Sequence, residues 1–467
     1  MQSPPQCFGR AVVGLTLHLI IFGFWQQHNK HKQLLVAVCV FGCKIGFLNL
    51  DRALMKFIYP KLINNLAIFF VLVSVFCIQL PTRYMDISLA ILFLFWAISG
   101  NYTYKLHKIL SNPGAIVSLL LFLVIGLCTL FSPELSHDSF RAWFRYHGLL
   151  FIPIIISLID ENKYRDYAIN TYLVCSSIVL LISYLKWFGI VPMDFIRSDS
   201  NGPVAFRHSI SQSIFIAYAI YLTFHKCKNS QNRIQIAWLI LILIFLANIF
   251  VVVDSRSGQI SFIAMFGLFL YRYWKASFLK YLLALFFSLI VLSQFNIFKT
   301  KSRLFNIQNE IHLAQTEHEV NSAGYRLELW TNTLLIIKRH PLLGGGAGSL
   351  QKEYKAFVPA ENIVIATKFG NPHSTYILIL QESGLIGLAA LIFLYYWHWT
   401  IASRLNKQFV YGSALKGLIV CFAISSLFNC MLWGGEAKFY YLLAGIFLSA
   451  YKPQQQKERS DIKLGFL

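Results

Sequence analysis

Charged side chains are scarce in this sequence, and acidic ones are the scarcest. Only 13% of the 467 residues are charged, with 20 acidic against 41 basic residues, whereas about 25% are charged in soluble domains. Hydrophobic residues make up 57% of the chain, and its mean hydropathy is +0.57. So few charges cannot cover the surface of a soluble globule, and the sequence predicts an integral membrane protein. The apolar runs are continuous rather than alternating, which excludes an outer-membrane barrel.

Several motifs that would point to other functions are also missing. The nine cysteines form no CxxC pair and no Cys/His cluster, which argues against a disulfide framework and a zinc site. The glycine run at 344–346 lacks the Lys-Ser/Thr that closes a phosphate-binding loop. The net charge of +21 is interpreted as basic loops that meet anionic lipid headgroups, rather than as a nucleic-acid surface.

Apolar stretches bounded by short polar segments recur along the whole chain, so we predict an all-α polytopic fold. The count is about 12–14 transmembrane helices, because two or three of the stretches are short. The candidate spans are 11–25, 33–50, 62–80, 86–100, 115–131, 147–160, 167–191, 208–225, 234–253, 258–275, 277–297, 373–401, 412–431 and 437–451.

The distribution of Lys and Arg between alternate loops predicts the orientation. One set of segments holds 20 basic residues and the opposite short segments hold nine, and the richer set is cytoplasmic by the positive-inside rule. Both termini are then inside. The expected organisation is N-terminal membrane helices over 1–297, a large outer, periplasmic loop with short amphipathic helices over 298–372, C-terminal membrane helices over 373–451, and a cytoplasmic tail over 452–467.

The outer loop contains an amphipathic helix in "GYRLELWTNTLLIIKRHPLLGGGAGSL". Leu327, Trp330, Leu334 and Ile337 recur at spacings of three and four, which predicts one apolar stripe on a helix that lies on the membrane or caps the bundle. The glycines that follow are expected to form a turn in which two backbones approach closely.

Directly after this loop, "NPHSTYILILQESGLIG" places His373 at the start of an apolar run. We expect Asn371 to cap a helix, Pro372 to occupy its first position, and His373 and Ser374 to lie in its first turn. The positive end of the helix dipole then keeps His373 neutral near pH 7 and favours a bound anion such as a diphosphate.

The pattern His373-Ser374, nine residues, then Gly384-x-x-Gly387 resembles the signature of the bacterial O-antigen ligases and related O-oligosaccharyltransferases. "RHSISQSIFIAYAIYL" and "DSRSGQISF" are similar to two upstream motifs of that superfamily, and "SLFNCMLWGGEAKFYYLLAGI" to its closing helix pair. The resemblance covers roughly residues 115 to 450. One departure is Leu388-Ala389, where ligases often have a threonine pair.

The resemblance implies a GT-C-like membrane glycosyltransferase in the bacterial inner membrane, with its active site facing the periplasm. Such an enzyme transfers a glycan en bloc from undecaprenyl diphosphate to lipid A–core, among membrane lipids, without a cofactor or metal. Matching motifs assign catalysis to His373, as general base, and to Arg256. The resemblance assigns substrate binding to Arg207, His208, Arg326 and Ser374, and the arginines among them are expected to bind the diphosphate.

Three alternatives remain open at this point. An O-antigen polymerase and a protein O-oligosaccharyltransferase would use the same chemistry, although protein-glycosylating members tend to carry an extra C-terminal outer domain where this chain ends in a short tail. A lipid-linked-glycan flippase would instead predict a charged central cavity, rather than arginines and a histidine gathered on one face.

Overall fold

The computed structural model describes residues 47–133, 135–194, 196, 202–253, 255–274, 280, 322–357, 371–405, 410–432 and 434–452. These residues form helices and no strands, so the predicted all-α class is confirmed. In chain order the helices are α3 (Phe47–Phe76), η1 (Cys77–Gln79), α4 (Thr82–Ile98), α5 (Tyr102–Leu110), α6 (Pro113–Leu130), α7 (His137–Phe144), η2 (Arg145–Leu150), α8 (Phe151–Leu158), α9 (Asn162–Trp187), α10 (Ser209–Lys228), α11 (Asn232–Ala247), η3 (Asn248–Val252), α12 (Arg256–Tyr273), α16 (Ser322–Ile337), α17 (Leu350–Phe357), α19 (Thr375–Arg404), α20 (Tyr411–Phe428) and α21 (Gly435–Leu448).

Six helices in the described part of the chain are long and apolar enough to cross a membrane, or seven if the bent pair α4–α5 counts as one span. The protein is therefore a polytopic helical membrane protein. The total of twelve to fourteen spans stays a prediction, because 11–25, most of 33–50 and nearly all of 277–297 lie outside the described residues. The predicted spans at 147–160, 208–225, 258–275 and 437–451 do form helices, but these are shorter or more polar.

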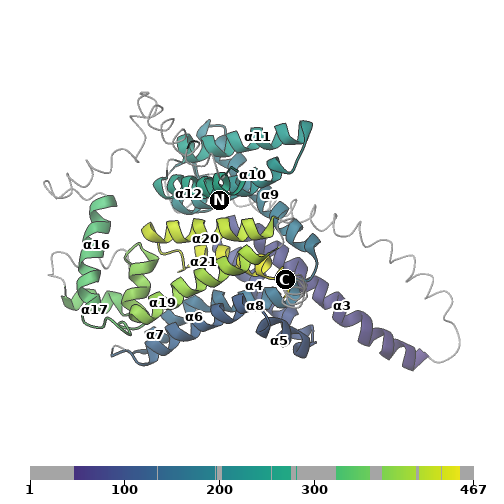
Figure 1. Cartoon of the computed structure of the whole chain (residues 1–467), viewed down its shortest axis with the longest axis horizontal. Coiled ribbons are helices and arrows are strands. Elements are labelled where there is room, and N and C mark those ends of the chain that lie inside the picture. The colour runs from purple at the N-terminus through teal and green to yellow at the C-terminus, as the bar shows by residue number, and fades with distance from the viewer. Residues whose placement is uncertain are drawn as a thin grey trace, which may run out of the picture.

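Helix α10 runs through the centre of the bundle. Every residue from 211 to 223 is buried, as expected of a helix that is apolar on all sides. Helices α12 and α20 pack along it, and α21 is buried over most of its length beside α8. Figure 1 shows these helices in layers, with α10, α11 and α12 above α19, α20 and α21, and α6 below them.

Helices α16 and α17 lie at one end of this bundle, and the short helix α5 lies at the opposite end (Figure 1). A separate apolar cluster of Leu329, Ile336, Leu350, Tyr354 and Leu378 joins α16 and α17 to the first turns of α19. This cluster sets the position of the capping helices relative to the segment that begins α19.

The helix predicted in the outer loop is present as α16, and its apolar residues differ in burial. Leu329, Thr333 and Ile336 are buried, whereas Leu327 and Leu334 are 42% and 46% exposed. Of the predicted apolar stripe, Ile337 is 9% exposed and Trp330 is half-buried, so the stripe is divided between the protein interior and the surface. Hydrophobic periodicity alone could not identify the buried face, because α16 has apolar residues on both sides.

Candidate functional site

His373 lies just before α19 and not inside its first turn, which corrects the expected helix start. The N-cap residue is Ser374 and the helix begins at Thr375. His373 itself has φ +49, in the left-handed region. The Asn371 side chain does accept a backbone N–H, but it is that of His373, at 3.0 Å. This is an Asx turn, which interrupts the chain before the helix instead of capping it.

Left-handed backbone marks both loops that carry the candidate histidines. Only four non-glycine residues in the described part of the chain have positive φ: Asn101, Phe206, Asn232 and His373. Phe206 directly precedes Arg207, whose N–H donates to Ala205 O at 2.7 Å to close a three-residue turn. Each such residue costs about 1–3 kcal/mol, and strain of this kind concentrates at functional sites. Asn101 and Asn232 are asparagines, which adopt this conformation readily, so the two residues for which it is unusual lie in the loops that carry the candidate histidines.

Three elements hold the His373 segment in place. The indole N–H of Trp330 in α16 donates to Pro372 O at 2.7 Å, and the Cys430 thiol donates to the Asn371 oxygen at 3.2 Å. The N–H of Thr375 donates to Asn429 O at 3.1 Å, which satisfies one of the amides left over at a helix start. The hydroxyl of Ser374, which is buried, donates to Ser426 O at 3.4 Å.

Arg326 lies one helical turn before Trp330 and therefore close to the same segment. Its charge, together with His208 and with burial, alters the ionisation of His373. Burial, followed by the electrostatic influence of Arg326 and His208, lowers the pKa of His373 to about 4. The imidazole is consequently neutral at pH 7. The expected protonation state is correct, but its causes are burial and two neighbouring residues of α16 and α10.

Arg256 is the first residue of α12 and is half-buried. The next residue, Ser257, accepts a hydrogen bond from the Asn429 side-chain amide at 3.1 Å, and the Asn429 carbonyl is the group that binds Thr375. One asparagine thus connects the start of the Arg256 helix to the start of the His373 helix. These two candidate residues come from segments more than 100 positions apart.

Arg207 and His208 are neighbours in sequence but occupy different environments. Arg207 is only 5% exposed, and its Nη2 donates to Ile78 O at 2.9 Å, so its guanidinium points toward η1 and the start of α21. His208 is exposed and acts as the N-cap of α10. The structure thus brings His373, His208, Arg326 and the start of the Arg256 helix together. The Arg207 side chain points away from this group, toward the Ile78 carbonyl.

The glycine run and the Gly384 position form one backbone-to-backbone contact. Gly384 has φ +61 and ψ −161 and interrupts α19. The N–H groups of Leu385 and Ile386, freed by this break, donate to Pro341 O and Leu342 O at 2.9 and 3.3 Å. In return, Gly345 and Gly346 donate to the carbonyls of residues 381 and 382. The predicted close approach of a glycine turn is confirmed, and its partner is the broken helix.

A buried carboxyl group at this break was missed by the sequence reasoning. Glu382 is 3% exposed. Its two oxygens accept from the Tyr146 hydroxyl at 2.5 Å and from the Gly348 N–H at 2.9 Å. The only available signal was the polar run Gln381–Glu382–Ser383 inside an otherwise apolar stretch. Because both oxygens bind groups from other elements, we interpret Glu382 as an anchor for the 341–349 loop.

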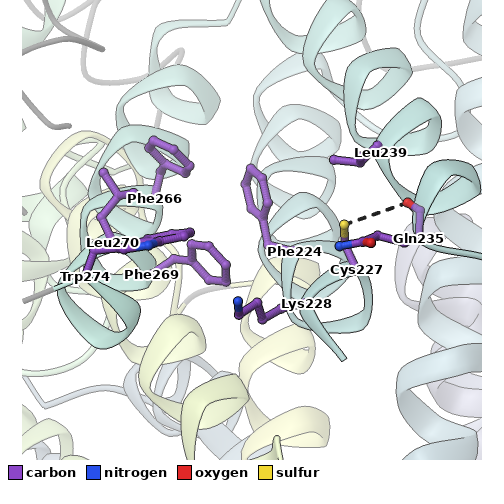
Figure 2. Close-up of a pocket in the computed structure, with 9 residues that line it drawn as sticks. All are labelled: Phe224, Cys227, Lys228, Gln235, Leu239, Phe266, Phe269, Leu270 and Trp274. Carbon is purple, nitrogen blue, oxygen red and sulfur yellow. Dashed lines mark hydrogen bonds between the residues drawn. The ribbon is translucent and has the colours of Figure 1, made fainter. Parts of the chain in front are cut away.

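The described residues also contain a cavity away from this region. A groove of about 460 Å³ lies between α10, α11 and the end of α12. Figure 2 shows Phe224, Phe266, Phe269 and Trp274 along its walls. Lys228 lies at its edge. None of the candidate site residues lines it. Among the described residues no three His, Cys, Asp or Glu side chains gather as a metal site would require.

Residues 241–392 match the family model of the O-antigen ligases. The matched part contains Arg256, Arg326 and His373 as well as the break at Gly384. Over these residues the chain is similar to the O-antigen ligase domain. No curated protein matches the chain.

The matched region extends from α11, through α12 and the capping helices, into the second half of the broken helix α19. Arg207 and His208 come from α10 and the loop before it, outside the matched residues, and yet His208 acts electrostatically on His373. The surroundings of His373 thus come from the matched residues, from the start of α10 and from the loop between α20 and α21.

Proposed function

We propose that the protein is an O-antigen ligase, which transfers a glycan chain en bloc from undecaprenyl diphosphate to lipid A–core at the periplasmic face of the bacterial inner membrane. The family description supports glycan transfer in general. The observation that carries the proposal is a neutral, half-buried histidine in a strained backbone conformation, with Arg326 close enough to affect its pKa.

The transfer requires an acceptor hydroxyl oxygen to attack the anomeric carbon of the donor, while the bond from that carbon to the diphosphate oxygen breaks. His373 is proposed to take the hydroxyl proton, which it can do only when it is neutral. The departing diphosphate carries the negative charge away from the reacting carbon. Arg256 and Arg326 are proposed to stabilise that charge, since a guanidinium binds two phosphate oxygens at once.

The remaining assignments follow from position. His208 is exposed next to His373 and is proposed to orient a sugar hydroxyl of donor or acceptor. Arg207 is proposed to bind diphosphate, which requires its side chain to turn away from the Ile78 carbonyl. Ser374 is proposed as a substrate contact, for which its hydroxyl would exchange the long bond to Ser426 O for one to a ligand.

The test is the set of glycolipids that accumulates when the gene is deleted. A ligase predicts full-length glycan on undecaprenyl diphosphate together with bare lipid A–core. Single repeat units on the core would indicate a polymerase, unmodified acceptor proteins a protein O-oligosaccharyltransferase, and donor held at the cytoplasmic leaflet a flippase. Each of these last three results contradicts the ligase assignment. Reporter fusions after residue 452 test the orientation, because a cytoplasmic tail leaves a periplasm-dependent reporter inactive.

A further inference from the structure

The start of α19 is joined to its surroundings by two asparagines to which the sequence motifs gave no role in glycan transfer. Asn371 lies two residues before His373, and its side-chain oxygen accepts both the His373 N–H at 3.0 Å and the Cys430 thiol at 3.2 Å. Asn429 lies in the loop between α20 and α21 and is 8% exposed. Neither residue lies inside a helix: Asn371 precedes α19, and Asn429 is the C-cap residue of α20.

The Asn371 contact acts on the backbone of His373 itself. A left-handed histidine persists only where its surroundings define that conformation, because the chain has lower-energy alternatives. The Asx turn provides such a constraint from one side, and the bond from Trp330 to Pro372 O provides a second one. Without the acceptor at position 371, the His373 N–H loses its partner in the turn. The backbone of His373 is then less constrained, and so is the orientation of its imidazole.

The Asn429 contacts act on the separation between two segments. Its carbonyl accepts from the N–H and the hydroxyl of Thr375, at 3.1 and 2.9 Å. Its side-chain amide donates to Ser257 Oγ at 3.1 Å and to Ser425 O at 3.3 Å. Since Ser257 follows Arg256 and Thr375 lies two residues after His373, a single residue fixes the guanidinium-bearing helix start to the imidazole-bearing one.

We propose that Asn371 and Asn429 are positioning residues for glycan transfer: Asn371 holds the backbone of His373 in its left-handed conformation, and Asn429 sets the His373 segment in register with the helix that begins at Arg256. This inference rests on the proposed function, because it acts through His373 and Arg256. Neither asparagine is required to touch the donor or the acceptor.

The first experiment measures kcat and KM of transfer, from a lipid diphosphate-linked glycan to lipid A–core, by the full chain in lipid nanodiscs. Asn371→Ala is expected to lower kcat up to roughly 10²-fold, as displacement of a reacting group by about 1 Å does, with little change in the KM for donor. Asn371→Asp keeps the acceptor oxygen and is expected to restore most of kcat. Its carboxylate stabilises the imidazolium, so the acid limb of its pH profile moves to higher pH.

A double variant separates a positioning role from a structural one. If Asn371 acts through His373, then Asn371→Ala adds no further loss to His373→Ala. An Asn371→Ala enzyme with unchanged kcat, beside an inactive His373→Ala enzyme, overturns the inference and leaves the proposed function intact. An active His373→Ala enzyme contradicts the base role of the proposed function instead. The isosteric Asn371→Asp variant keeps the test decisive if the alanine variant fails to fold.

The second experiment is a double-mutant cycle between Asn429 and Ser257 in the same assay. Asn429→Ala and Ser257→Ala are each expected to lower kcat. The doubly substituted enzyme is expected to lose about as much of kcat as Asn429→Ala alone. Full additivity of the two losses overturns the role of Asn429. Asn112→Ala is the matched control, because Asn112 is a buried asparagine that bonds Gly114 and Leu448 O at the other end of α6. It is expected to reduce stability and leave kcat unchanged.

Discussion

Replacement of Gly384 by alanine tests whether the break in α19 is a fixed structural feature. Gly384 has φ +61 and ψ −161, a combination open essentially to glycine alone and worth about 1–3 kcal/mol of strain for another residue. An added Cβ would also lie 2.2 Å from the carbonyl carbon and oxygen of Leu342 and 2.6 Å from Leu343 N. These are backbone atoms already bonded to α19, so they cannot move aside. Such overpacking costs about 1–3 kcal/mol more.

The combined penalty of about 2–6 kcal/mol is a large part of the 5–15 kcal/mol typical of folded domains. Gly384→Ala is therefore expected to lower the thermal midpoint in nanodiscs sharply and to reduce the yield of monodisperse protein. Gly100→Ala is the control, since Gly100 has a similar φ of +68 but nothing within 4 Å of an added Cβ. It measures the cost of a positive φ without the steric contact. If the two variants prove equally stable, the contact between the glycine loop and the broken helix is not as described.

Three further predictions concern the same region. Arg326→Gln removes a positive charge that disfavours imidazolium, so the pKa of His373 rises from about 4. The acid limb of the pH profile of kcat/KM then moves to higher pH. An acid limb that stays in place or moves to lower pH contradicts the role of His373 as the base. Glu382→Leu leaves the Tyr146 hydroxyl and the Gly348 N–H without an acceptor, at about 1–3 kcal/mol for each group, whereas Glu382→Gln keeps one acceptor. We therefore expect the leucine variant to have a lower thermal midpoint than the glutamine variant. The reverse order is incompatible with an anchoring role for Glu382. Trp330→Phe loses one hydrogen bond, worth about 0.5–1.5 kcal/mol of stability, and should lower kcat more than it changes KM for donor; an unchanged kcat would show that α16 does not position His373.

Hydrophobic runs were sufficient to predict the all-α membrane fold, because each membrane helix satisfies its own backbone and must be apolar along its length. The same runs did not show that α19 is interrupted. The break depends on carbonyls and amides supplied by the 341–346 segment, about 40 residues earlier in the chain. Hydrogen bonds between segments this far apart in sequence leave no periodic signal. Only the glycines at 344–346 and at 384 and 387 pointed to a close backbone contact.

For the candidate site, the sequence identified the residue types but not their local conformations. His373 was predicted inside a helix because Asn-Pro commonly starts one, whereas the structure uses the asparagine for an Asx turn. The electrostatic influence of Arg326 and His208 could not be derived either, since it arises from the packing of α16 and α10 against the same segment. Residue roles that depend on tertiary neighbours are beyond a single sequence.

The central claim is that His373 serves as the base of a glycan transfer. The most direct measurement is single-turnover transfer to lipid A–core by purified wild-type and His373→Ala protein, with donor binding measured in parallel. We expect a loss of about 10²–10⁴-fold in the transfer rate, with donor binding retained. A transfer rate equal to that of the wild type, at equal donor occupancy, would contradict the claim.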